Sequence, residues 1–516
     1  MDKKRLIFYS VSVFFISLFI FASNIWGLSI YSLDEAKNSE CAREMLERGD
    51  FIVPTFNYQL RTDKPPLHYY FMMFSYKLFG VNEFSARFFS SVFGALTVLI
   101  TFLISHRYLG LKTAFLSFMV LISSLHTAIQ FHMAVPDPYL IFFINGSLFS
   151  FLYGFIERKK VFIYLFYTLM GFGILSKGPV AVVLPSVIVS LYLIFTKNLN
   201  VKNFKFLSIP TGLLILLLVA LPWYIAVYIK TDGVWIKEFI FKHNIKRFSQ
   251  PLEGHGGAFI ITYIFVIVGL LPFSIFFIQA IKRAFENRKN SLILFSLIFG
   301  FVYVIFFSLS KTKLPNYTVP AYPPLAIILA YYLSKIELSK RYSLILSLAF
   351  YLIITLAVPV ALYFAINSEE TISDLNYLSF YFILWFIGGV IGLILIFKRV
   401  SYLIYPLSIS SILLSLLFFF HIFPKVDNRN PVKQMLPLID ERKSIYYYGS
   451  FNPAFVFYMR KEIPPIELSE IERKRNFYII TRKRFLETLK KYPELKVLRI
   501  YKDLFEKHYS TLIYKE

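Results

Sequence analysis

Two adjacent carboxylates, Asp34 and Glu35, follow the first apolar segment of the chain. At a membrane surface such a pair can take a proton from a hydroxyl group or bind a cation. The pair also suits the start of a helix, with Asp34 as the N-cap and Glu35 in the first turn, where the helix dipole favours negative charge. The residues alone slightly favour the helix start and leave the catalytic role open.

A second acid, Asp63, begins the motif Asp63-Lys64-Pro65-Pro66-Leu67-His68. A proline keeps the residue before it out of helical geometry, so Asp63 and Lys64 are held in an extended segment. This rigidity suits a binding site, and it suits equally well a simple turn into a following helix.

A third acid, Asp137, lies between Pro136 and Pro138 at the start of an apolar segment. A carboxylate near membrane depth is costly, so it indicates a functional group by default. A helix cap is the competing interpretation, and the sequence does not decide between the two.

Lysines interrupt apolar segments at two further places. Lys177, in Ser176-Lys177-Gly178-Pro179, can bind a phosphate or extend its ammonium group to the membrane surface. The segment 310–317 contains Lys311, Lys313 and Tyr317, and it is a basic short loop on the side where such loops should not be basic. Departures from a general pattern are expected at functional sites, so this segment favours anion binding.

A fourth group contains His243, Lys246, Arg247 and His255. A histidine together with a carboxylate can hold a metal ion. The spacing of these residues is not typical of a known metal site, so the residues alone favour no metal here.

The composition indicates the kind of protein that positions these groups. Hydrophobic residues make up 57% of the 516 residues, whereas soluble proteins contain about 45–50%. Such a chain cannot bury its apolar surface in one aqueous core, so lipid must cover part of it. The net charge of +24 then favours basic cytoplasmic loops and anionic lipids over nucleic acid. The single cysteine, Cys41, excludes an intrachain disulfide and a cysteine-based metal cluster.

A transmembrane helix needs about 20 apolar residues, and the sequence predicts about thirteen such helices, the first of them uncleaved. They are expected at 6–28, 84–105, 113–130, 138–156, 161–176, 179–196, 206–229, 259–281, 291–309, 319–334, 342–365, 377–397 and 401–423. Every second short loop is basic, which predicts a cytoplasmic N-terminus. The basic loops are 107–112, 158–160, 197–205, 282–289, 335–341 and 398–399.

Three longer segments then lie outside: 29–83, 230–258 and 424–516. The first two predict helices at the membrane surface, at Asp34–Arg48, from Leu67 to Phe79 and at Trp235–Phe248. The third predicts a small α/β domain with strands at Ile445–Tyr448, Phe477–Ile480 and Val497–Tyr501 and a helix at Arg482–Lys491.

All of the candidate groups lie on the same predicted side of the membrane. Lysines and arginines neutralise a phosphate, and carboxylates can deprotonate an acceptor hydroxyl. Together these groups indicate a phosphate-bearing lipid as the substrate.

The motifs together resemble the aminoarabinose (lipid A) transferase branch of the GT-C glycosyltransferases, which is related to the protein O-mannosyltransferases. The resemblance rests on the acids after the first span and on the motifs around Lys64, Lys177 and 311–317, and it covers nearly the whole chain. It implies a polytopic α-helical membrane protein of the GT-C type with about thirteen transmembrane helices. The expected domains are a transmembrane catalytic domain, 1–423, and a periplasmic α/β domain, 424–516.

The resemblance also implies a reaction at the periplasmic face of the inner membrane. The donor would be a sugar on a polyprenyl phosphate such as undecaprenyl phosphate, and the acceptor lipid A or a related glycolipid. Asp34 would be the base and Asp137 a second acid, and we add Glu35 as a further catalytic candidate. The donor phosphate would be bound by Lys64, Lys177 and Arg247, and we add Lys311, Lys313 and Tyr317 as candidates.

A divalent metal ion is a further implication of the resemblance. It would be held by Asp63 together with His243 or His255. The family often has glutamate before Lys-Pro-Pro, so Asp63 gives a shorter reach to the metal. No organic cofactor is expected.

The acceptor would attack the anomeric carbon in one displacement, which inverts the configuration there. Within the enzyme class, a protein O-glycosyltransferase is the closest alternative. A lipid-linked sugar flippase or transporter is a second alternative, although such proteins usually have internal repeats and helices broken near mid-membrane. A structural or assembly protein would leave the clustered acids and lysines unexplained. The sequence does not identify the sugar or decide between a lipid and a protein acceptor.

Overall fold

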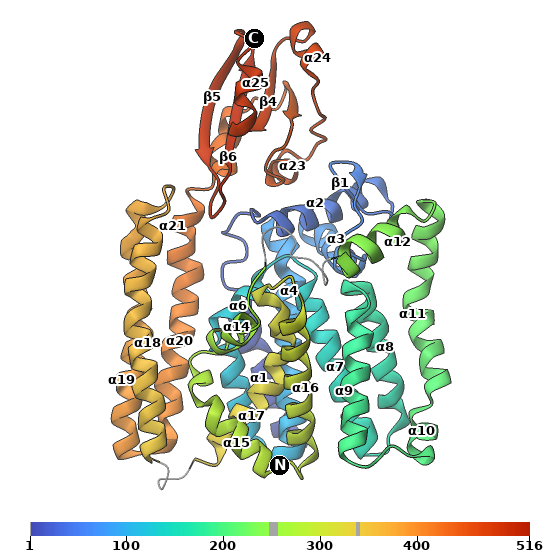
Figure 1. Cartoon of the computed structure of the whole chain (residues 1–516), viewed down its shortest axis with the longest axis vertical. Helices are drawn as coiled ribbons and strands as arrows, with labels where there is room; N and C mark the ends of the chain where they lie inside the picture. The colour runs from blue at the N-terminus through green and yellow to red at the C-terminus, as the bar shows by residue number, and fades with distance from the viewer. Residues whose placement is uncertain (1, 247–255, 337–340) are drawn as a thin grey trace.

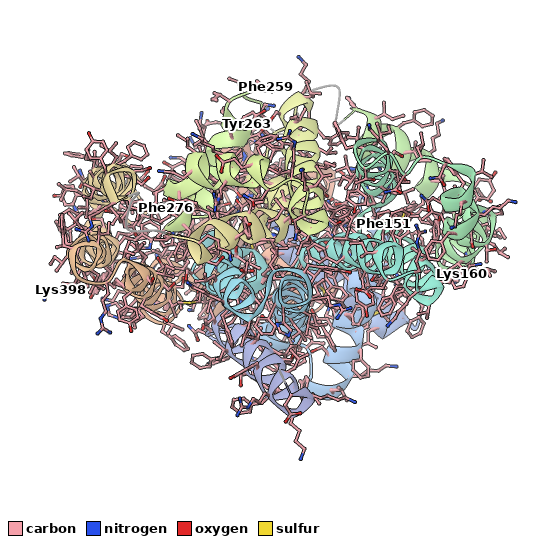
Figure 2. The ribbon with its side chains drawn as sticks, turned by 90° about the horizontal axis from the view of Figure 1, so that it is seen from below. Phe151, Lys160, Phe259, Tyr263, Phe276 and Lys398 are labelled. Atoms are coloured by element: carbon pink, nitrogen blue, oxygen red, sulfur yellow. The ribbon has the colours of Figure 1, made fainter. Side chains whose placement is uncertain are left out.

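The computed structural model describes residues 2–246, 256–336 and 341–516 of the chain. Its helices stand side by side in a bundle, and a small sheet domain rises from one end (Figure 1). The N-terminus lies at the opposite end of the bundle from this domain. Seen from that opposite end, α18, α19 and α20 form a group beside the other helices (Figure 2).

Apolar residues run all round most of the bundle helices, as expected for helices that contact both protein and lipid. The helices are α1 (Lys3–Phe21), α4 (Glu83–Leu109), α5 (Leu111–Ile122), α6 (Leu125–His132), α7 (Asp137–Ile156), α8 (Lys160–Lys177), α9 (Val180–Phe195), α10 (Val201–Leu207), α11 (Ile209–Lys230), α14 (Ile261–Gly269), α15 (Phe277–Glu286), α16 (Ser291–Leu309), α17 (Tyr322–Ser334), α18 (Arg341–Asn367), α19 (Ile383–Lys398) and α20 (Ile404–Leu417).

Within the described residues, nine helices are long and apolar enough to cross a membrane, and eleven if each bent pair counts as one span. The bent pairs are α5 with α6, at 68°, and Ile261–Gly269 with Phe273–Glu286, at 112°. The predicted polytopic α-helical fold is therefore confirmed, but the count of thirteen is not. The difference lies in α9 and α17, which have 16 and 13 residues and are shorter than the roughly 20 residues of a full span.

Surface helices cover the end of the bundle that carries the sheet domain (Figure 1). They are α2 (Leu33–Arg48), α3 (Leu67–Phe79), α12 (Val234–Glu238) and the π-helical turn η1 (Phe239–Lys246). A short hairpin, β1 (Thr55–Phe56) and β2 (Gln59–Leu60), connects α2 to α3. Helices are thus present where the sequence predicts surface helices, apart from the last two residues of 235–248, which lie outside the described part.

The sheet domain has the strand order β3-β4-β6-β5. Strand β3 (Ser444–Tyr448) is parallel to β4 (Phe477–Arg482), and β6 (Tyr509–Lys515) is antiparallel to both β4 and β5 (Leu495–Lys502). The short helices of the domain are α23 (Ala454–Met459), α24 (Leu468–Arg473) and α25 (Leu486–Leu489).

The three predicted strands correspond to β3, β4 and β5, while β6 is a strand that the sequence analysis does not predict. The predicted helix at 482–491 is reduced to a 3-10 turn and the four residues of α25. The predicted domain boundary at 424 falls in α21 (Phe423–Asp427), and α22 (Pro431–Met435) still precedes the first strand of the sheet.

Hydrogen bonds attach the sheet domain to the β1–β2 hairpin and to the bundle. The Asn57 side chain donates to the Ile463 carbonyl and accepts from its N–H, both at 2.8 Å. The Tyr458 hydroxyl donates to Glu83 at 2.9 Å and accepts from the N–H of Ile30 at 2.8 Å. The domain is therefore fixed to the β1–β2 turn and to the start of α4.

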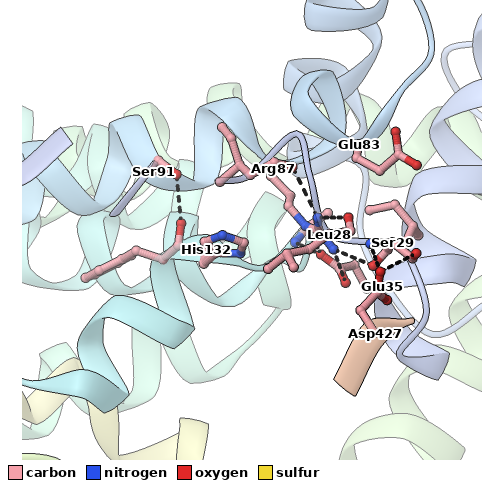
Figure 3. Close-up of polar contacts among 12 residues, drawn as sticks. Leu28, Ser29, Glu35, Glu83, Arg87, Ser91, His132 and Asp427 are labelled. Carbon is pink, nitrogen blue, oxygen red and sulfur yellow. Dashed lines mark hydrogen bonds and ion pairs between the residues drawn. The ribbon is translucent and has the colours of Figure 1, made fainter. Parts of the chain in front are cut away.

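A buried ion pair between Glu35 of α2 and Arg87 of α4 lies below this junction (Figure 3). The Arg87 guanidinium donates to both carboxylate oxygens of Glu35, at 2.7 and 3.0 Å, and also to the carbonyls of Leu28 and Ser29. The N–H of Ala134 donates to the same carboxylate at 2.9 Å. This one pair therefore joins the loop after α1, α2, α4 and the link between α6 and α7.

Replacement of Arg87 by methionine should destabilise the fold strongly, because it leaves the Glu35 carboxylate buried without its cation. Breaking a buried pair in this way costs about 3–5 kcal/mol. The matched control is Arg107→Met, since Arg107 lies on the same helix and also pairs with a glutamate, Glu157, but its side chain is 55% exposed. Thermal unfolding in detergent should show a large fall in Tm for Arg87→Met and a small one for Arg107→Met. Equal falls in Tm for the two variants would contradict the conclusion that the buried Arg87–Glu35 pair stabilises the fold more than an exposed pair does.

Candidate functional site

A cavity of about 490 Å³ lies between the segment before α3, the facing ends of α7 and α8, η1 and α16. The predicted site residues that line it are Asp63, Lys64, Asp137, Lys177, His243 and Tyr317. These six residues come from five separate segments of the chain, so the fold assembles a set of charged and aromatic groups that are far apart in the sequence.

The first residue of α7 and the last residue of α8 form an ion pair in the cavity wall. The Lys177 ammonium donates to Asp137 Oδ1 at 2.6 Å, and the Asn316 side chain donates to the same oxygen at 2.9 Å. The ammonium also lies 5.0 Å from the centre of the Tyr317 ring. Three of the motifs that the sequence analysis singles out therefore meet at one point.

Gly178 allows the chain to turn directly after Lys177. Its φ is +97°, a conformation that side chains rarely adopt, and a Cβ there would lie 2.7 Å from the Phe239 ring. Glycine at this position lets α8 end against η1, which brings Lys177 and the η1 residues into the same cavity.

Asp63 and Lys64 reach the cavity from the extended segment before α3. Both oxygens of Asp63 accept from the Arg61 guanidinium, at 2.6 and 2.9 Å. Burial alone would raise the pKa of Asp63, but the Arg61 guanidinium, helped by Lys64, holds this pKa well below its usual value. Asp63 is therefore a permanent anion, and its charge is balanced within the chain.

Lys64 is only 6% exposed, and its ammonium has no hydrogen-bond partner among the residues that the structure describes. A buried cation normally has a partner. Because Lys64 lines the cavity, its charge is available to a ligand there.

The remaining walls of the cavity are mostly apolar. Val180 and Val183 of α9 face it together with Phe306 and Phe307 of α16 and Ile240 of η1. Val183 and Ile240 are 48% and 40% exposed, so the apolar wall continues to the outer face of the bundle. The cavity thus combines cations with an apolar surface, as a ligand with a charged head and a hydrocarbon chain requires.

Two predicted catalytic acids do not line this cavity. Asp34 lies in the first turn of α2 and is exposed. Glu35, the next residue, is buried in the ion pair with Arg87, which favours a structural role over the predicted catalytic one. Successive residues of a helix point in different directions, so only one of this pair can face α4.

The candidate residues of the basic segment 310–317 also differ in their positions relative to the cavity. Lys313 is buried, and its ammonium donates to the carbonyls of Ser308 and Ser310, at 2.7 and 2.8 Å. It therefore caps the C-terminal end of α16, where carbonyls lack helical partners and favour a cation. Lys311 is exposed and does not line the cavity, while Tyr317 does.

The structure describes only some of the residues predicted to bind a metal ion. Asp63 and His243 line the same cavity, but His255, like Arg247, lies outside the described residues. No group of three or more metal-binding side chains is found in the part of the chain that the structure describes.

Arg61, Asn316 and Tyr303 belong to the site region but are not among the predicted site residues. Arg61 is two residues from Asp63, and Asn316 is next to Tyr317. Each therefore stands beside a predicted site residue, and this position could have identified it. Tyr303 is 1% exposed and lines the cavity, with a hydroxyl that has no partner within the described residues. It looks like any other aromatic residue of an apolar span, so no sequence pattern identifies it.

Comparisons with known proteins agree with this geometry. The family model described as dolichyl-phosphate-mannose-protein mannosyltransferase matches residues 63–225. An uncharacterized protein of Aquifex aeolicus is 31% identical over 353 residues, which cover 68% of this chain and 69% of that protein. An undecaprenyl phosphate-alpha-4-amino-4-deoxy-L-arabinose arabinosyl transferase of Shewanella sediminis is 28% identical, over 89% of this chain and 86% of its own.

The fold is shared with a solved structure over its whole length. The crystal structure of ArnT from Cupriavidus metallidurans bound to undecaprenyl phosphate superposes with a TM-score of 0.83, at 18% identity, over 99% of this chain and 98% of that one. Taken with the sequence relatives and the cavity, this places the protein: the chain belongs to the GT-C glycosyltransferase family of the aminoarabinose transferases, which is related to the protein mannosyltransferases.

Proposed function

We propose that the protein transfers a sugar from a polyprenyl phosphate to an acceptor at the membrane surface. The observation that carries this proposal is the cavity in which the Lys64 and Lys177 ammonium groups lie against an apolar wall. A polyprenyl phosphate has the matching chemistry, an anionic phosphate on a long hydrocarbon chain. Undecaprenyl phosphate is named in the activity of the Shewanella sediminis relative and is bound in the ArnT crystal structure.

In the proposed complex, Lys64 and Lys177 bind the donor phosphate, and the prenyl chain lies along Val180, Val183 and Phe306. Charge-assisted hydrogen bonds from ammonium groups to phosphate are among the stronger polar contacts in proteins. Arg247 remains a proposed third cation. Asp137 holds Lys177 in place, since its oxygen accepts from both Lys177 and Asn316.

The reaction is a single displacement at the anomeric carbon. An oxygen of the acceptor forms the new bond to this carbon, and the bond from the carbon to the phosphate oxygen breaks with its electron pair on the phosphate. The lysines neutralise the charge that develops on this leaving group, so no acid is needed there. Asp34 is the proposed base that takes the acceptor proton, and attack from the opposite face inverts the configuration.

The proposed acceptor is lipid A or a related glycolipid. The family model matched by residues 63–225 carries the name of a protein mannosyltransferase, so a protein acceptor is the second candidate. A transfer assay in lipid vesicles tests both, with the purified chain, a radiolabelled undecaprenyl-phosphate sugar, lipid A and a protein extract. Label that moves to lipid A supports the proposal, and label that moves to protein supports the second candidate. Label that crosses the bilayer without covalent transfer would indicate a flippase and would refute the proposal.

Replacement of Lys64 or Lys177 by methionine should weaken donor binding, because each change removes one cation that faces the phosphate. The loss of one such charge-assisted contact should raise the Kd for radiolabelled undecaprenyl phosphate by about tenfold or more. Lys237→Met is the matched control, since Lys237 is exposed on the neighbouring helix α12. A Kd that is unchanged in both cavity variants would contradict the assignment of the donor phosphate to this cavity.

Replacement of Asp34 by asparagine should abolish transfer while donor binding is retained, because the change removes a base but no phosphate ligand. General base catalysis contributes about 100-fold or more, and the initial rate at saturating donor measures this effect. Asp232→Asn is the control, as Asp232 is an exposed aspartate in the loop before α12. Undiminished transfer by Asp34→Asn would exclude Asp34 as the base.

We also propose that the chain lies in the inner membrane with a cytoplasmic N-terminus and a periplasmic sheet domain. Figure 2, viewed from the end opposite the sheet domain, shows Lys160 and Lys398 near the edge of the bundle. Both residues belong to loops that the sequence analysis assigns to the cytoplasm. Basic residues collect on the cytoplasmic side, which supports this orientation.

Cysteine labelling tests the orientation directly. The native Cys41 is buried, so background labelling should be low. In intact spheroplasts, a membrane-impermeant maleimide should label Lys491→Cys in the sheet domain, while Lys289→Cys should react only after the membrane is opened. Both native lysines are exposed. The reverse pattern would overturn the proposed orientation.

A further inference from the structure

The strongest unexplained feature beside the site is the Arg61–Asp63 pair. Arg61 Nε donates to Asp63 Oδ1 at 2.6 Å and Nη2 donates to Oδ2 at 2.9 Å, so two parallel hydrogen bonds join the groups. Arg61 is 6% exposed, and its carbonyl accepts from the Trp235 indole N–H at 2.9 Å. This bidentate geometry is strong and directional, and Trp235 of α12 fixes the main chain at Arg61.

This pair bears directly on the metal that the family resemblance implies at Asp63. A metal ion there would lie next to a buried guanidinium that already engages both carboxylate oxygens, and next to the Lys64 ammonium. The donor set is also small: His243 and Asp137 line the same cavity, but Asp137 is paired with Lys177, and the described residues contain no group of three metal-binding side chains. Protein zinc sites have at least three side-chain ligands. The described residues therefore do not form a zinc site, and no step of the proposed reaction uses a metal ion.

We infer that Arg61 takes the place of a metal ion in this chain: its guanidinium neutralises Asp63, and Lys64 is thereby left free to bind the donor phosphate. The inference rests on the proposed function, since it requires a donor that carries a phosphate. Arg61 is a positioning residue, because it acts through Asp63 and does not line the cavity itself.

The order of charges along the segment determines which cation Asp63 binds. Lys64 is the neighbour of Asp63 in the sequence and lines the same cavity. If Asp63 had no other partner, a buried carboxylate would draw this nearest ammonium into an ion pair. Because Arg61 already engages both oxygens of Asp63, the Lys64 ammonium lines the cavity and donates no hydrogen bond to any described residue.

The inference predicts a rescue that a purely structural role would not produce. Arg61→Met should raise the Kd for undecaprenyl phosphate by about tenfold, because Asp63 then pairs with Lys64. The double variant Arg61→Met/Asp63→Asn removes both charges of the pair and should return the Kd to near that of the unmodified chain. Arg48→Met is the matched control, since Arg48 also stands two residues before an aspartate, Asp50, but at 3.7 Å and with a partly exposed side chain.

Two measurements on the purified full-length chain in detergent test the inference. The first is the Kd for radiolabelled undecaprenyl phosphate in each variant, and failure of the double variant to recover would overturn the inference. The second is the metal content of the unmodified chain by mass spectrometry, with donor binding measured before and after treatment with EDTA. We expect no bound divalent metal and unchanged binding. About one equivalent of metal, lost together with donor binding, would overturn the inference.

The metal measurement does not depend on whether the Arg61 variants fold. Neither measurement requires sugar transfer, so the two proposals can fail separately. Rescue of donor binding without any transfer would refute the proposed reaction and support the role of Arg61. Transfer without rescue would support the reaction and refute the role of Arg61.

Discussion

The rest of the structure depends on the buried ion pair between Arg87 and Glu35. Two charges removed from water are stable only when their hydrogen-bonding groups are satisfied, and here they nearly all are. Arg87 binds the carboxylate and the carbonyls of Leu28 and Ser29, while Glu35 also accepts from Ala134. Because Ala134 lies three residues before Asp137, the pair that holds α2 against α4 also fixes the start of α7, where the site begins.

Most of the charged side chains around the cavity are also paired. Asp137 is matched by Lys177 and Asp63 by Arg61, each within 2.6 Å. After these pairs are formed, Lys64 is a cation at the cavity that has no hydrogen-bond partner among the described residues. A site with one uncompensated cation held between neutralised pairs can bind an anion without a large rearrangement of its own charges, which is the advantage of preorganisation.

Much of this arrangement could be predicted from the sequence. The long apolar segments and the proline-flanked Asp137 and Lys64 motifs identify the helices and several residues that meet in the cavity. The sequence does not show which charges pair with each other, because that depends on contacts between segments far apart in the chain. The sequence alone does not distinguish the adjacent carboxylates Asp34 and Glu35, because the helix that points them in different directions is seen only in the structure. In the same way, Lys313 is predicted as an anion ligand, whereas in the structure it caps α16. Strand β6 is not predicted, although it follows β5 after a short connection and pairs antiparallel with it, so the sequence contains a local signal for this strand.

The sheet domain has two edges, and each is protected in a different way. Beside β3, the segment around Pro465 forms a bridge to Tyr447 and covers that edge. The other edge, β5, carries Lys496, Arg499 and Lys502 and has an irregular register between Val497 and Arg499. Positive side chains and a bulge both discourage a foreign strand from pairing with an open edge. The two edges therefore oppose self-association of the domain through its strands.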